Sequence, residues 1–240
     1  MYRFKFYFIV VILSVTTIGV AVAQTSNVLT KNEKQNGWRL LFDGKTFDGW
    51  QKLSNAGWVI NSGLLMAQAF NGGGQKDIIT TDQFENFELS VEFKILKATN
   101  SGIKYLVTNN YHGHEGSYLG LEYQILDDVN FKYPERGVYR SLASLYDLIP
   151  SNKKEIVPLN KWNIAKIIVN RNHIEHWLNG NKVVEYDRST EEFNSLVAGS
   201  KYKSMKNFGK ATRGHILLQN EGTPIDFRSI KIRPLSENTK

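Results

Sequence analysis

Three side chains near the middle of the chain combine a cation, a carboxylate and an amide. Lys104 lies in the strand-like run Ile103–Val107, and Glu122 and Gln124 lie in the run Leu119–Leu126. Side chains alternate between the faces of a strand, so these three residues share one face if the runs pair antiparallel. Such a surface can grip a small polyhydroxylated ligand, and it can equally be an exposed Lys–Glu cross-strand pair.

The other face of both runs is apolar. The residues expected in the core are Ile103, Tyr105 and Val107 in the first run and Leu121, Tyr123 and Ile125 in the second. A half-buried antiparallel pair is therefore expected, with the polar set turned to solvent.

From residue 37 to residue 236 the chain reads as one domain of short strands separated by Gly/Asn turns. The expected strands are 38–43, 58–60, 64–69, 77–81, 87–95, 103–107, 119–126, 137–139, 145–148, 162–170, 173–178, 183–187, 215–219 and 226–232. Asn179-Gly180 and Asn61-Ser62-Gly63 predict hairpins, because these residues accept the positive φ of primed turns.

One short helix is expected at Ser189, which with Glu192 three residues later fits a capping box. Its buried stripe would be Phe193, Leu196 and Val197. Many short strands, one helix and no βαβ rhythm predict an all-β fold, a sandwich of two sheets.

Strands far apart in the sequence add polar residues to an outward face. Parity places His215, Gln219 and Arg228 opposite the core side of the last two expected strands. In a curved sandwich such a face forms a concave binding surface, and we expect these residues to line it together with the central pair.

The N-terminus has the layout of a secretory signal peptide. Residues 1–23 contain Arg3 and Lys5, an apolar run and the ending Ala21-Val22-Ala23. Residues 24–36 are polar and are expected to form a tether. We therefore expect an exported protein, periplasmic or secreted, that is not held at a membrane after cleavage.

Composition excludes several classes. The chain has no Cys, so the fold rests on its core without disulfides. The formal net charge is +7, but the Lys and Arg residues are scattered, which argues against a nucleic-acid partner. No cofactor motif is present, and neither a G-x-S-x-G elbow nor a phosphate-binding loop occurs.

The sequence contains neither a complete set of metal ligands at a recognised spacing nor a pair of carboxylates on the strand face of Glu122. His112 and His114 lie in a Gly-rich loop without a third ligand at a recognised spacing. Retaining glycosidases need two carboxyl groups about 5–5.5 Å apart. On the strand of Glu122 the next acid, Asp127, has the wrong parity, so two-carboxylate hydrolysis is disfavoured.

Several blocks together resemble the 3-keto-disaccharide hydrolase family, long catalogued as a domain of unknown function in glycosyl hydrolases. The blocks are Leu41–Lys45 with Gly49-Trp50, Asn100–Lys104, Gly120–Asp127, Ser144–Ile149, Lys161–Asn163, Glu175–Gly180, Leu218-Gln219 and Phe227–Ile230. They follow the order of the family and span residues 37–235. Two departures are Ser229, where Asn is expected, and Glu221, where many relatives carry His.

The resemblance implies a concanavalin A-like jelly-roll β-sandwich that cleaves a glycoside already oxidised to a ketone at C3. A separate sugar 3-dehydrogenase would supply this substrate. A base removes the C2 hydrogen, which the ketone acidifies; the enolate expels the C1 oxygen, and water adds back. Such chemistry needs one base, a cation at the ketone oxygen and an acid for the leaving group.

We assign Glu122 as the base and Lys104 as the stabiliser of the enolate, with Tyr146 or His176 as the acid. The residues expected to bind the substrate are Gln124, Asp127, Trp177, His215, Gln219 and Arg228. His176 shares parity with Ile174 and Leu178, so it is either this acid or a core histidine.

Several alternatives remain open. Trp177 is either a stacking platform or ordinary packing, and Asp127 either orients a neighbour or caps a turn. If a divalent ion is used, Glu122, Asp127 and a histidine are its expected ligands. The competing classes of protein are a non-catalytic carbohydrate-binding domain and an ordinary endoglycosidase.

Overall fold

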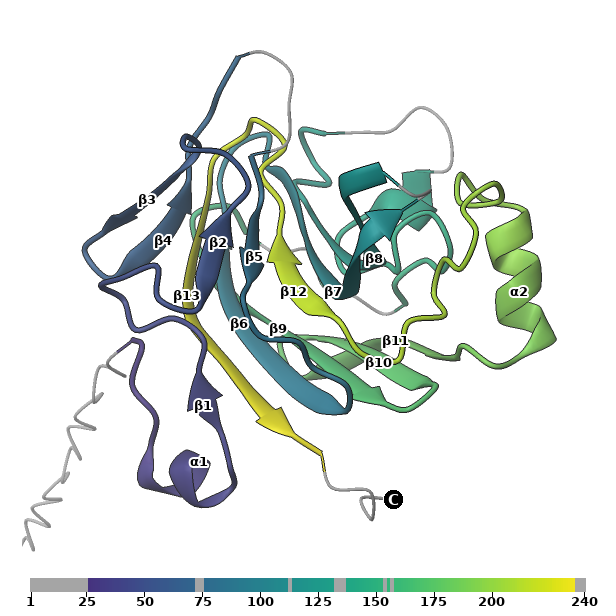
Figure 1. Ribbon diagram of the computed structural model, residues 1–240. Helices are drawn as coiled ribbons and strands as arrows, with labels where there is room; N and C mark the ends of the chain where they lie inside the picture. The colour runs from purple at the N-terminus through teal and green to yellow at the C-terminus, as the bar shows by residue number, and fades with distance from the viewer. Residues whose placement is uncertain are drawn as a thin grey trace, which may run out of the picture.

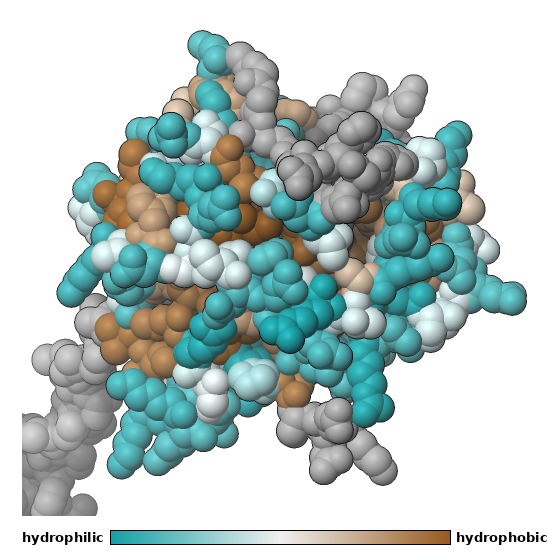
Figure 2. All heavy atoms as spheres, in the orientation of Figure 1, coloured by the Kyte–Doolittle hydropathy of each residue, from teal (hydrophilic) through white to brown (hydrophobic). Residues whose placement is uncertain are grey.

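The chain folds as a sandwich of two antiparallel β-sheets (Figure 1). The computed structural model describes residues 26–71, 76–111, 114–131, 137–152, 155 and 158–235. The expected β-sandwich is confirmed, and the part of the chain described here contains two α-helices rather than one. In Figure 2 the hydrophobic residues that reach the visible face form separate patches among hydrophilic side chains.

The larger sheet has eight strands, and the last strand of the chain lies near its middle. The strands are β1 (Arg39–Leu40), β3 (Trp58–Asn61), β4 (Leu64–Ala67), β6 (Phe87–Ile95), β9 (Trp162–Asn170), β10 (His173–Leu178), β11 (Asn181–Asp187) and β13 (Ile225–Pro234). Their order is β11-β10-β9-β6-β13-β4-β3. The strand β1 pairs with residues 231–232 of β13, after the part of β13 that pairs with β4.

The smaller sheet has five strands and carries the central pair. The strands are β2 (Trp50–Lys52), β5 (Ile78–Thr80), β7 (Asn100–Tyr111), β8 (His114–Leu126) and β12 (His215–Leu218). Their order is β2-β5-β12-β7-β8. The strand β2 has no counterpart among the strands expected from the sequence.

The inner faces of the two sheets form one core. Of the residues expected there, Ile103, Tyr105, Leu121, Tyr123 and Ile125 are buried in it. Val107 is not, because the register of β7 shifts between Tyr105 and Thr108, where Leu106 takes a φ of +50°. Leu106 enters the core in its place, and Val107 packs with Ile79 and Leu217.

Most expected turns and strands are confirmed, but two of the expected strands and the cap of the expected helix differ. Asn179-Gly180 joins β10 to β11, and Ser62-Gly63 joins β3 to β4, with positive φ at all four residues. Residues 137–140 form a 3-10 helix, η1 (Gly137–Arg140), instead of a strand, and residues 145–148 form turns with isolated bridges at Leu145 instead of a strand. The helix α2 (Glu191–Ala198) is capped by Thr190 rather than Ser189, and Phe193 is its buried residue.

The N-terminal segment is folded rather than a tether from Ser26 onward. Asn27 exchanges backbone and side-chain hydrogen bonds with Ser229, and α1 (Lys31–Gln35) begins at a capping box of Thr30 and Glu33. The expected signal peptide lies outside the described residues. Among the helices that the structure describes, none is long and apolar enough to span a membrane.

Candidate active site

Two rows of residues cross the outer face of the smaller sheet. Cross-strand pairing aligns Ile79, Leu217, Lys104 and Glu122 in one row. The next row on this face contains Gln219, Gly102 and Gln124, since the Gln219 N–H donates to the Gly102 carbonyl and Gly102 pairs with Gln124. The structure therefore brings together Lys104, Glu122, Gln124 and Gln219, as the sequence predicts.

Glu122 and Lys104 are direct cross-strand partners at the centre of this face. Glu122 is only 5 % exposed, and its carboxylate accepts no hydrogen bond from the residues that the structure describes. Burial raises the pKa of Glu122, and the positive charges of Lys104 and Lys201 offset part of that rise. A carboxylate with a raised pKa and free oxygens has the properties of a general base.

Gly102, in the second row, has no side chain, and oxygens from both rows lie close to it. A Cβ at this position would lie 2.3 Å from Gln219 Oε1 and 3.1 Å from Glu122 Oε1. Both oxygens therefore lie in the space that a side chain at residue 102 would need, so any such side chain would displace them. The Gln219 amide also donates to Glu221 Oε1 at 3.3 Å, and the Gln124 amide donates to Asn100 Oδ1 at 3.0 Å.

Tyr146 lies beside Glu122 although it belongs to neither sheet. The segment after η1 runs along β8, where the Tyr146 N–H donates to the Glu122 carbonyl at 3.0 Å and Leu145 bridges to Tyr123. This bridge turns Leu145 into the core, where it is 1 % exposed, and leaves Tyr146 half-buried. Tyr146 is thus placed at the site as expected.

Two further charged residues, Asp77 and Lys201, lie at this face although no sequence pattern predicted them there. Asp77 lies directly before β5; burial raises its pKa, while the Asn220 N–H partly offsets the rise. Lys201 follows α2 and is exposed, yet desolvation lowers the pKa of its ammonium and Glu122 partly offsets this. Asp77 lies on the same face of its strand as Ile79, but only the order of the strands in the sheet shows that it lies near Gln219. Lys201 lies in an irregular segment, where side-chain periodicity predicts no position.

His176 is a core histidine and does not reach this face. Its ring lies between the sheets with no exposed surface, 2.8 Å from the Tyr105 hydroxyl at Nε2 and 3.2 Å from the Ala143 carbonyl at Nδ1. Burial lowers the pKa of His176 to about 4, so the ring is neutral at pH 7. The assignment of His176 as leaving-group acid is wrong, because the ring lies on the inner face of β10.

Trp177 and Arg228 lie on the outer face of the larger sheet, on the opposite side of the sandwich. The Trp177 indole donates to Glu175 Oε2 at 2.6 Å, and Arg228 Nε donates to Glu92 Oε2 at 2.7 Å. Parity placed Arg228 outward correctly, but the molecule has two outer faces. The assignment of both residues to the substrate surface of Glu122 is wrong for that reason.

Asp127 and His215 also make other contacts. The Asp127 carboxylate accepts the N–H groups of Ala98, Val129 and Asn130, so it caps the turn that ends β8. His215 lies on β12, where Nδ1 is 2.7 Å from the Thr80 carbonyl and Nε2 is 3.0 Å from the Gln83 amide. Neither residue is turned toward Glu122.

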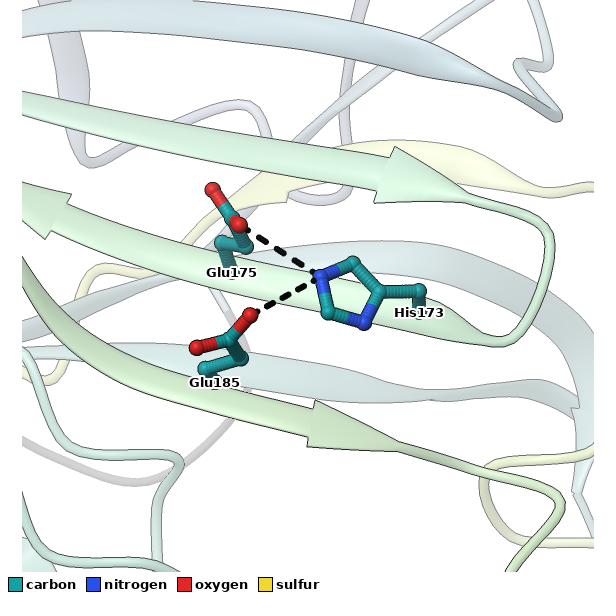
Figure 3. Close-up of side chains that lie close together, drawn as sticks. All are labelled: His173, Glu175 and Glu185. Atoms are coloured by element: carbon teal, nitrogen blue, oxygen red, sulfur yellow. Dashed lines mark hydrogen bonds and ion pairs between the residues drawn. The ribbon is translucent and has the colours of Figure 1, made fainter. Parts of the chain in front are cut away.

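Among the residues that the structure describes, no group of metal ligands surrounds Glu122, and the one such group elsewhere also contacts a lysine. Asp127 and the described histidines lie away from Glu122, and His112 and the side chain of His114 lie outside the described residues. Within the part of the chain described, His173, Glu175 and Glu185 are the one group with ligand atoms within 4.8 Å of one another (Figure 3). The Lys182 ammonium lies 3.2 Å from Glu175 and 2.7 Å from Glu185, so a lysine already pairs with both carboxylates of this group.

The fold and the polar face define a two-sheet β-sandwich with a buried carboxylate at the centre of one outer face. Residues 37–233 match the family described as 3-keto-alpha-glucoside-1,2-lyase-like domain. The chain belongs to this family.

Relatives agree with this assignment. The chain is 32 % identical over 229 residues to a "3-keto-disaccharide hydrolase" of Bacteroides thetaiotaomicron, covering 83 % of this chain and 79 % of that protein. A "putative glycosyl hydrolase" of Parabacteroides distasonis is 28 % identical, with a TM-score of 0.80 over 88 % of this chain and 100 % of that chain. A galectin-like protein of Bacillus subtilis, 12 % identical with a TM-score of 0.50 over 87 % and 94 % of the two chains, shares the fold.

Proposed function

We propose that the chain is an enzyme that cleaves 3-keto-glycosides by elimination and water addition. The observation that carries this proposal is Glu122, a buried carboxylate that accepts no hydrogen bond from any described residue and lies directly opposite Lys104. The family and the name of the B. thetaiotaomicron relative support the choice of substrate.

The reaction assigns one task to each group. Glu122 takes the proton from C2, and the electron pair of that bond moves to the C3 ketone oxygen, where Lys104 stabilises the enolate. The enolate then re-forms the ketone, a C1–C2 double bond forms, and the C1–O bond breaks as Tyr146 donates a proton to the leaving oxygen. Water adds at C1 and a proton returns to C2, so the sum is hydrolysis.

Gln124 and Gln219 flank this centre and would hold sugar hydroxyls, since both amides lie on the same face. The signal-like sequence of residues 1–23 supports export to the periplasm or the medium. A sugar 3-dehydrogenase is the reaction partner that the substrate requires.

Asp77 favours a second candidate, ordinary glycoside hydrolysis. The sequence offered no second acid on the strand of Glu122, but Asp77 from β5 also has a raised pKa and influences Glu122 through space. Inverting glycosidases hold their two carboxyl groups about 6.5–9.5 Å apart to admit water. This candidate would act on native sugars.

Paired native and 3-keto disaccharides, followed by mass spectrometry in D2O, test the proposal. We expect wild type to cleave only the keto form and to leave one deuterium at C2 of the released keto sugar. Glu122→Gln should slow cleavage by about 10²–10⁴-fold while sugar binding is kept. Glu92→Gln, on the outer face of the other sheet, is the matched control and should cleave normally.

Other outcomes select the alternatives. Cleavage of the native sugar, or a product without deuterium, would overturn elimination and favour the two-carboxylate hydrolase. Binding without cleavage of either sugar would make the chain a carbohydrate-binding domain. A parallel series with chelator tests whether a divalent ion takes part, and the released product incubated without enzyme corrects for exchange at C2.

A further inference from the structure

The ring of Tyr146 contacts two cations. Lys201 Nζ is 4.1 Å from the ring centroid, and Arg140 Cζ is 5.5 Å from it. Cations over an aromatic face are attracted by its quadrupole, so both contacts restrict the ring. Tyr146 in turn donates its backbone N–H to Glu122, which links this stack to the candidate base.

Asp147 anchors both cations. Its Oδ1 accepts from Arg140 Nε at 2.8 Å, and its Oδ2 accepts the backbone N–H of Lys201 at 2.9 Å. Asp147 has no exposed surface and takes a φ of +65°, a left-handed conformation that costs energy for a residue other than glycine. This buried carboxylate therefore ties the segment of Tyr146 to the segment of Lys201, 54 residues further along the chain.

Lys201 differs from an ordinary surface lysine in the charged groups that surround its ammonium. Among the described residues its ammonium forms no ion pair, whereas most lysines of the other outer face do. Its electrostatic neighbours are Glu122, Lys104, Asp147 and Arg140. Glu122 is faced in turn by Lys104, Lys201, Glu221 and Asp77.

We propose that Lys201 is a positioning residue of the active site: anchored through Asp147, its ammonium holds the Tyr146 ring beside Glu122 and supplies a second positive charge there. The inference rests on the proposed function, because it assigns the tasks of base and acid to Glu122 and Tyr146. Lys201 acts through these two groups. It keeps Glu122 ionised to lower pH than Lys104 alone would, and it fixes the phenol toward the leaving oxygen.

Substitution of Lys201 by Met tests the proposal with two independent readouts. The acidic limb of the kcat/KM profile reports the ionisation of Glu122, and we expect Lys201→Met to move it to higher pH by roughly 0.5–1 unit, because a positive charge is lost. The kcat should fall about 10-fold as Tyr146 loses its support. Lys201→Arg keeps the charge and should restore the position of the limb.

A titration of the Glu122 carboxyl by carbon-13 NMR, without substrate, separates this inference from the proposed function. Its midpoint should rise in Lys201→Met and stay unchanged in Lys203→Met, an exposed lysine of the same turn. An unchanged midpoint in Lys201→Met would overturn the inference whatever the activity. If the midpoint shifts but the protein cleaves no 3-keto-glycoside, the interaction between Lys201 and Glu122 is supported and the proposed function is overturned.

Discussion

The outer faces of the two sheets carry the same kinds of charged side chains and use them in opposite ways. Glu88 on β6 and Glu122 on β8 are each 5 % exposed. Glu88 lies 2.8 Å from the Lys166 ammonium and 2.5 Å from Arg233, whereas Glu122 accepts no hydrogen bond among the described residues. The pKa of Glu88 is lowered by these partners despite its burial, and the pKa of Glu122 is raised by burial.

Burial alone therefore does not mark a functional carboxylate. On the larger sheet the cations also pair with Glu92, Asp226, Glu175 and Glu185. Paired charges stabilise or are neutral; an unpaired, desolvated carboxylate costs stability and is kept where its reactivity is needed. The contrast separates the candidate active site from a surface of ion pairs.

The largest expected effect contrasts a lysine from each face. Lys104→Met should lower the kcat for a 3-keto-disaccharide by about 10²–10³-fold, because a cation that stabilises a developing oxyanion is lost. Lys166→Met should leave kcat within about twofold, since Lys166 pairs with Glu88 on the opposite side of the sandwich. Equal losses in both variants, measured at saturating substrate, would break the comparison.

The next effect concerns stability against pH. The raised pKa of Glu122 means that the folded state binds its proton more tightly, so Glu122 weakens folding above its unfolded pKa near 4.5 and less so as pH falls. The lowered pKa of Glu88 contributes stability above 4.5 that is lost as pH falls through its folded pKa.

Urea unfolding between pH 4 and 8 measures both terms. At pH 7, Glu122→Gln should raise the free energy of unfolding and Glu88→Gln should lower it, each by on the order of 1 kcal/mol per unit of pKa shift. The difference for Glu122 should shrink as pH falls toward 4.5, whereas the difference for Glu88 should begin to shrink only below pH 4.5. Changes of the same sign at pH 7 would show that the two carboxylates do not differ in this way.

The smallest effect is expected from Arg228, which the sequence placed at the site and the structure does not. Arg228→Met breaks a partly exposed ion pair with Glu92 and a contact over the Trp162 ring. Stability should fall by at most about 1 kcal/mol, and kcat/KM should stay within twofold. A tenfold loss of kcat/KM with normal stability would return Arg228 to the substrate surface.

Local patterns predicted the strands well because alternation and turn chemistry are properties of neighbouring residues. Phe87–Ile95, Trp162–Asn170 and His173–Leu178 have the bounds expected from their sequences. Lys104, Glu122 and Gln124 were found for the same reason, since one hairpin sets their common face. Val107 was misplaced because the register shift at Leu106 reverses the parity of the side chains that follow. No residue type in this stretch predicts such a shift.

The remaining errors concern which sheet a strand joins. Parity distinguishes the inner face of a strand from its outer face, and a sandwich has two outer faces, so Arg228 was assigned to the wrong one. The helix α1 was missed although Thr30 and Glu33 have the spacing of a capping box. Tyr146 was placed correctly only through the family resemblance, and Lys201 and Asp77 needed the tertiary structure.

The position of β13 has a consequence for how the protein is made. This strand lies between β6 and β4 and also holds β1, yet it is the last to leave the ribosome. Until residue 234 emerges, the larger sheet exists only as two halves with open edges, which attract other strands. We therefore expect the nascent chain to need protection from aggregation until β13 emerges, and a chain that stops before residue 225 lacks the strand that joins the halves.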